Sequence, residues 1–162
     1  MRRILNVHAG KEATMRSFLS KYITVALLAL ALSASANAQE GLVVIGNSKG
    51  SPAQLRLNQL QSILKGEKQR WNDGTKVVIA LMKTNTPVGS STSKRVLNMT
   101  GDQLNKYWLA LVFQGKADAP TFFSSESELE SFVAQTPGAI GVIGQTASTA
   151  KVILLDGKRS IL

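Results

Sequence analysis

The sequence predicts a single α/β domain in which a mixed sheet is flanked by helices. Short continuous apolar runs, typical of buried strands, alternate along the chain with segments whose apolar residues recur at spacings of three and four, as in amphipathic helices. Residues 39–162 follow a predicted export signal and number 124. That length is enough for one hydrophobic core and too short for two, so one domain is expected.

The first predicted strand is residues 42–45, a run of four apolar residues that ends in the turn-like sequence GNSKGSP. The next apolar residues, Leu60, Ile63 and Leu64, have the spacing of one helix face, and Gly66 stands where such a helix would stop. Residues 71–74 (WNDG) predict a turn, and residues 77–81 (VVIAL) predict a second buried strand.

Two helices are expected in the middle of the chain, the first from near Ser91 through Met99 and the second from about Asp102 to Gly115. The apolar residues of the second helix recur at three and four and are Leu104, Tyr107, Trp108, Leu111 and Val112. Trp108 and Phe113 are both predicted to pack in the core, because aromatic residues at helical spacing normally point inward.

The last third of the chain predicts one helix and two strands. Ser125 and Glu128 match a capping box, and the apolar residues that follow it are Leu129, Phe132 and Val133. Pro137 and Gly138 would end that helix, after which residues 139–143 and 152–155 read as strands.

The N-terminus has the order of parts found in a secretory signal peptide. Arg16 and Lys21 precede an apolar run at residues 23–32, and residues 36–38 (ANA) form an A-x-A cleavage signature, so cleavage is expected before Gln39. Ten residues are about half of the roughly 20 that a membrane-spanning helix needs, and therefore no membrane span is expected after cleavage.

Residues 1–14 lie upstream of Met15, which itself opens a complete signal sequence. We interpret them as a mis-assigned leader, although the sequence leaves open whether translation starts at Met1 or at Met15. The expected parts are thus a leader at 1–14, a signal peptide at 15–38 and a domain at 39–162. The chain has no cysteine, which removes the usual lipid attachment point, so the product is expected to be a soluble exported protein.

The charge of the whole chain, +9, overstates how basic the predicted domain is. Residues 1–38 hold five of the 19 Lys and Arg and one of the ten Asp and Glu, which leaves 14 and 9 in residues 39–162 and a net charge of +5. No run of basic residues is interleaved with aromatics, so nucleic acid is not an expected partner.

Enzyme activity is not expected, and neither is a cofactor or a metal. The single histidine, His8, lies in the leader, so residues 39–162 lack His and Cys, the commonest metal ligands and the partners in most nucleophile–base pairs. Glu126, Glu128 and Glu130 are spaced by two, which puts neighbours on different faces of a helix, and we interpret them as a solvated helix face.

The stretch TPVGSSTSKR at residues 86–95 is the candidate anion site. A helix that begins near Ser91 would present unpaired backbone N–H groups and the positive end of its dipole, both of which attract an oxyanion. The candidate ligand-binding residues are Ser90, Ser91, Thr92, Ser93, Lys94 and Arg95. The alternative, that one hydroxyl caps the helix and the others face water, stays open at this point.

Three blocks of the sequence carry a resemblance to a known family. They are residues 63–74 (ILKGEKQRWNDG), residues 108–115 (WLALVFQG) and residues 137–141 (PGAIG). Together they resemble the substrate-binding proteins of phosphate ABC transporters, in particular short single-lobe members, over residues 42–152. The resemblance implies a lobe like that of the type II periplasmic binding proteins, and residence in the periplasm.

The resemblance also implies where the ligand would lie. In phosphate-binding relatives an arginine and a following Ser-Gly-Thr-like segment at a helix start hold the anion, and that segment corresponds to residues 86–95. Gly89 stands near where short relatives carry the arginine, so the charge is absent or displaced to Lys83, Lys94 or Arg95.

The resulting hypothesis is an exported solute-binding protein that binds phosphate or a related oxyanion in connection with uptake or sensing. Its expected partners are the anion and an ABC transporter permease, a second lobe or a second protomer. The alternative is a non-transport interaction or structural module that kept the lobe and lost the ligand.

Overall fold

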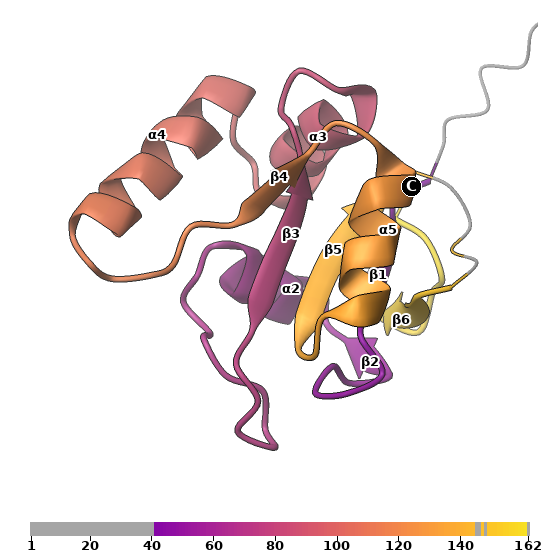
Figure 1. Ribbon diagram of the computed structural model, residues 1–162. Coiled ribbons are helices and arrows are strands. Elements are labelled where there is room, and N and C mark those ends of the chain that lie inside the picture. The colour runs from indigo at the N-terminus through magenta and orange to yellow at the C-terminus, as the bar shows by residue number, and fades with distance from the viewer. Residues whose placement is uncertain (1–40, 145–146, 148, 162) are drawn as a thin grey trace, which may run out of the picture. The chain divides into compact units, whose positions relative to one another are not determined.

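The computed structural model describes residues 41–144, 147 and 149–161 (Figure 1). The predicted leader and signal peptide lie outside the described residues. No helix among the residues described is long and apolar enough to cross a membrane.

A six-stranded sheet with the order β2-β6-β1-β5-β3-β4 forms the centre of the domain. The strands are β1 (Val43–Gly46), β2 (Gln54–Leu55), β3 (Val78–Met82), β4 (Thr121–Phe123), β5 (Ala139–Ile143) and β6 (Lys151–Leu155). β1 runs antiparallel to both of its neighbours, β5 and β6, whereas β3 pairs with β4 and β5 in parallel, as β2 does with β6. The sheet is therefore mixed, and the predicted α/β class is confirmed.

Four α-helices and a short π-helical segment complete the described domain. They are α2 (Leu57–Leu64), α3 (Pro87–Ser91), the π-helical segment η1 (Thr92–Val96), α4 (Gly101–Phe113) and α5 (Glu126–Gln135). Figure 1 shows α5 in front of the sheet and α2 behind it, with α4 on the outer side beyond β4. The helices thus lie on both faces of the sheet, as an α/β fold requires.

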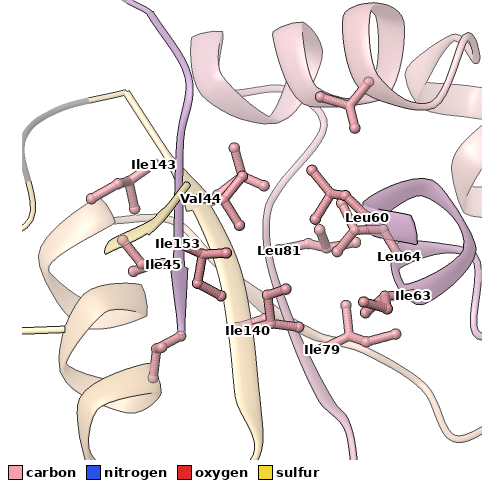
Figure 2. Packing of buried hydrophobic residues seen from close by; sticks show 14 of the residues in the cluster. Val44, Ile45, Leu60, Ile63, Leu64, Ile79, Leu81, Ile140, Ile143 and Ile153 are labelled. Carbon is pink, nitrogen blue, oxygen red and sulfur yellow. The ribbon is translucent and has the colours of Figure 1, made fainter. Parts of the chain in front are cut away.

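The core fills the space between the sheet and α2. Figure 2 shows Leu60 and Leu64 of α2 close to Leu81 of β3 and Ile140 of β5, and all four side chains are buried. On the other face α5 approaches β5 closely, because a Cβ atom at Gly141 would lie 2.7 Å from a methyl carbon of Leu129. The predicted apolar face of α2 and the predicted strands at β3 and β5 are therefore buried as expected.

Two edge strands, β2 and β4, are not predicted by the sequence pattern. β2 has two residues and β4 has three, and β4 directly follows the buried Pro120. Runs this short carry no periodic signal of their own, and both are strands because a longer neighbour, β6 or β3, offers them backbone hydrogen-bond partners.

The predicted core position of Phe113, at the end of α4, is wrong. Trp108 is 3 % exposed and belongs to the core as expected, but Phe113 is 82 % exposed and Val112 is 42 % exposed. Only one face of α4 contacts the rest of the domain, and five residues of helix rotate Phe113 away from it. Aromatic character alone therefore gave the wrong position for Phe113.

The prediction that all three carboxylates of α5 face water is also wrong. Glu128 is exposed as expected, but Glu130 is 5 % exposed, and its Oε1 accepts hydrogen bonds from the backbone N–H groups of Thr149 and Ala150 at 2.6 and 3.2 Å. Glu126 accepts the Gly144 N–H at 2.7 Å. These two carboxylates bind chain segments that the sequence spacing could not reveal.

Candidate functional site

The stretch 86–95 begins at the carboxyl end of β3, where Thr86 forms a tight turn. Its backbone N–H and its hydroxyl both donate to the Lys83 carbonyl, at 2.9 and 2.8 Å, and the hydroxyl accepts the Gly89 N–H at 3.1 Å. Pro87 occupies the first helical position, where its fixed φ suits a helix and its missing N–H removes no helical hydrogen bond. Thr86 and Pro87 therefore start the helix immediately after the strand.

This start corrects the predicted one near Ser91. The Thr92 N–H lies within hydrogen-bond reach of the Val88 and Gly89 carbonyls, so it belongs to the interior of the helical stretch. The first turn lies four residues earlier, and few of its backbone donors remain for an anion, because Pro87 has no N–H and the Gly89 N–H already donates to Thr86. The predicted start was too late because any of the four consecutive Ser and Thr residues at 90–93 could cap a helix. In the structure Thr86 is the N-cap and Pro87 takes the first helical position.

The six candidate residues separate into an outward set and an inward set. Ser90, Ser91 and Arg95 are half-buried and Lys94 is exposed, whereas Thr92 and Ser93 are buried. Each serine stands four residues before a cation, which is close to one turn of either an α- or a π-helix, so the four outward residues share one side of the stretch. The structure thus brings two hydroxyls and two cations to one side of the helix; this set is called the outward face below.

The two inward hydroxyls have different surroundings. The hydroxyl of Ser93, which is fully buried, donates to the Ser90 carbonyl at 3.0 Å. Thr92 is 4 % exposed, and its Oγ1 has no hydrogen-bond partner among the described residues. Leaving a buried hydroxyl unpaired costs about 1–3 kcal/mol, so Thr92 is an energetic irregularity at the centre of the stretch.

Gly89 is a glycine because the helix approaches the end of β3 very closely. A Cβ atom at this position would lie 2.1 Å from the Lys83 carbonyl oxygen, a separation that no side chain tolerates without backbone movement. An arginine at position 89, which the resemblance implies for short relatives, is therefore incompatible with this backbone. The cations that remain near the stretch are Lys83, Lys94 and Arg95.

The carboxyl ends of β3 and β4 lie at the same edge of the sheet, because the two strands are parallel. The Lys83 N–H donates to the Phe123 carbonyl at 2.9 Å, which continues the ladder to this edge. α5 begins here as well, but Glu126 and Glu128 occupy its first turn and would repel an anion. Of the two helix starts at this edge, that of α3 suits an anion better.

The capping box predicted at the start of α5 is wrong, because Ser125 makes no side-chain cap hydrogen bond.

Three cavities lie elsewhere on the described domain, with volumes of about 230, 350 and 250 Å³. The first lies beside Gly66 and Trp108, the second beside Ser51 and Trp71, and the third between α4 and Pro120. None of the three is lined by residues 86–95. Among the described residues, no group of three or more His, Cys, Asp or Glu side chains could hold a metal ion.

Comparison with solved structures identifies the fold. A Clostridium perfringens protein described as a phosphate ABC transporter substrate-binding protein, with bound phosphate, matches at a TM-score of 0.58 and 14% identity. An ABC-type phosphate transport receptor from Vibrio cholerae matches at 0.56 and 17% identity, and PstS from Borrelia burgdorferi at 0.58 and 17%. This chain has their fold. The resemblance that the sequence motifs indicated is thus confirmed at the level of the fold.

These matches cover most of this chain but only part of each matched protein. They cover 73–74% of this chain but only 46–48% of the other three, so the chain spans about half the length of the phosphate-binding proteins that it matches. No protein-family model matches the chain, and no curated protein matches its sequence.

Proposed function

We propose that this protein is an exported solute-binding protein that binds phosphate or a similar oxyanion in connection with uptake or sensing. Cleavage of residues 15–38 would release it into the periplasm, where an ABC transporter permease is the proposed partner. The observation that carries the proposal is the fold, which the chain shares with about half of three phosphate-binding or phosphate-transport proteins.

The outward face of Ser90, Ser91, Lys94 and Arg95 is the proposed ligand-binding surface. Hydroxyl donors and two cations supply the hydrogen bonds and the charge that a tetrahedral oxyanion needs. The face lies on the helical stretch that begins at the carboxyl end of β3, and ligands of open α/β sheets commonly bind outside the carboxyl ends of strands. Thr92 and Ser93 are buried on the inward side, so their side chains are not part of this surface.

The proposed affinity is weak. Gly89 leaves no room for the arginine that the resemblance implies, and half-exposed groups compete with water for the anion. We therefore expect dissociation constants in the micromolar to millimolar range, roughly −8 to −4 kcal/mol. Because much of the attraction is between exposed charges, affinity should also fall as the salt concentration rises.

Phosphate titration followed by backbone amide NMR shifts tests the proposal. Saturable shifts are expected at residues 86–95, larger with phosphate or sulfate than with a neutral sugar. Arg95→Gln and Ser91→Ala should each weaken binding several-fold. Lys106→Gln, which removes an exposed cation from α4, is the matched control and should leave affinity unchanged. Absence of saturable shifts at 86–95, or equal weakening by Lys106→Gln, would contradict the proposed site.

A second candidate function is a non-transport interaction module that kept the fold and lost the ligand. The observation that favours it is the exposed apolar surface on α4, formed by Leu109, Val112 and Phe113. The same titration distinguishes the two functions, because an interaction module would show no saturable response to any anion.

A further inference from the structure

α4 carries an apolar surface that no described residue covers. Leu109, Val112 and Phe113 are 58 %, 42 % and 82 % exposed, and they are the large apolar side chains exposed on the described domain. Their spacing of three and four places them on one side of the helix. We call these three residues the α4 apolar surface. Figure 1 shows α4 on the outer side of the domain, where a second molecule can reach it.

An apolar groove lies next to this surface. It has a volume of about 250 Å³ and runs between α4 and the segment that leads into β4. Its walls are Asn105, Trp108, Leu109 and Val112 from α4, and Ala119, Pro120 and Phe122 from the other side. Phe113 is not one of its walls but directly follows Val112, which is, and Phe113 is 82 % exposed, so an exposed aromatic side chain stands next to a groove residue in α4.

We propose that the α4 apolar surface is the interface of a homodimer, in which Phe113 of each copy occupies the α4–β4 groove of the other. A protruding group and a matching recess close together on one surface are the requirement for an isologous interface, which uses the same patch on both copies around a two-fold axis. Aromatic side chains seated in apolar pockets are also the usual anchors of protein interfaces.

The charges at the ends of α4 favour an antiparallel pairing of the two copies of this helix. Asp102 lies in its first turn and Lys116 follows its last turn, and both residues are exposed. Antiparallel α4 helices would bring the acidic end of each helix toward the basic end of its partner and would oppose the two helix dipoles favourably. The groove itself contains no charged side chain, so nothing charged has to be desolvated at the centre.

The area of the surface sets the strength of the dimer. An aromatic side chain buries about 150–250 Å², so the three exposed side chains offer on the order of 300 Å² per copy. Two such surfaces bury about 600 Å², which is less than the roughly 1,000 Å² of a stable specific interface, so a weak and transient dimer is expected. It should dissociate in the micromolar range or above.

Analytical ultracentrifugation of the purified protein without phosphate tests the proposal, over about 10 µM to 1 mM so that weak association is detected. The average mass should rise toward that of a dimer with concentration. Phe113→Glu should weaken association at least tenfold and leave the thermal midpoint unchanged, because the ring is exposed in the monomer. Ser127→Glu, which adds the same charge at an exposed position of α5, is the matched control and should associate like the parent.

Two results would overturn the inference. The first is a protein that stays monomeric throughout this range, whatever partner of another class it binds. The second is a Phe113→Glu variant that associates as well as Ser127→Glu, which would place the contact on another surface. Since no anion is present in the experiment, either result is independent of whether residues 86–95 bind phosphate.

Discussion

At the scale of single residues, Trp108 and Phe113 show how two aromatic side chains on one helix serve different purposes. Trp108 is buried against Gly66, where a Cβ atom would come within 2.8 Å of the indole ring, whereas Phe113 points away from the domain. Burial against a close-packed neighbour makes the first residue structural. Exposure leaves the second free to contact another molecule.

Replacing each of the two aromatic residues by alanine should therefore give very different stabilities. Trp108→Ala is expected to lower the free energy of unfolding by about 3–5 kcal/mol, the usual cost of truncating a large buried aromatic side chain. Phe113→Ala is expected to change it by no more than about 0.5 kcal/mol, as at other surface positions. Urea denaturation at a low protein concentration measures both values. Equal losses in the two variants would mean that α4 packs through a different face.

Gly89 gives a second prediction at the residue scale. Gly89→Ala places a methyl group against the Lys83 carbonyl and should destabilise the domain by about 1–3 kcal/mol, the range found when a tightly packed site is overfilled. Ser90→Ala, at the next position, is the control and should cost much less, because Ser90 is half-buried. A Gly89→Ala variant that unfolds at the same urea concentration as Ser90→Ala would refute the close approach.

At the scale of elements, a hydrogen bond from a tyrosine side chain connects α4 to the end of α2. The Tyr107 hydroxyl donates to the Lys65 carbonyl at 2.9 Å, next to the turn at Gly66. Burial raises the pKa of Tyr107 above its usual value of 10.0, and the nearby charge of Glu67 raises it further. The neutral phenol is thus the form that the folded protein favours.

This raised pKa predicts how stability depends on alkaline pH. A group whose pKa is higher in the folded state contributes stability that is fully present below its unfolded pKa, near 10, and is lost as the pH rises through the folded-state pKa. The urea midpoint should fall over this range, and Tyr107→Phe should remove that part of the fall. Absorbance of the phenolate reports the titration directly, since Tyr107 is the sole tyrosine after the predicted cleavage. A Tyr107 that titrates at or below pH 10 would contradict the prediction.

At the scale of the whole molecule, the predicted signal peptide leads to a prediction about processing of the chain. Mass spectrometry of the exported protein should find Gln39 as the first residue, as itself or cyclised to pyroglutamate, because Ala36 and Ala38 form the A-x-A pattern of small side chains that signal peptidase accepts. An intact N-terminus on the protein recovered from the soluble periplasmic fraction would show that residues 15–38 are not a cleaved signal.

The whole domain also corresponds to about half of each phosphate-binding protein that it resembles. A single lobe exposes its ligand to water, which is consistent with the weak binding proposed for residues 86–95. The proposed dimer joins two such domains through α4. It does not depend on a ligand, so binding and association can be measured separately.

The sequence was enough to predict the α/β class, the apolar face of α2, the strands β3 and β5, and a candidate site at 86–95. These features follow from local periodicity and from the residue types within a few positions of one another. The three motif blocks added the resemblance that the fold comparison confirmed. Whether Ser90, Ser91, Lys94 and Arg95 bind an anion stays a prediction.

Contacts between distant parts of the chain could not be predicted and are seen in the three-dimensional structure alone. The helix predicted to start near Ser91 starts at Pro87. Glu130, predicted to face water, is buried and bonded to the backbone of residues 149 and 150, and Phe113, predicted to lie in the core, is exposed. The structure also shows that the carbonyl of Lys83 occupies the space that a side chain at Gly89 would need. Each of these facts depends on atoms contributed by another part of the backbone or chain, and a local pattern carries no information about their positions.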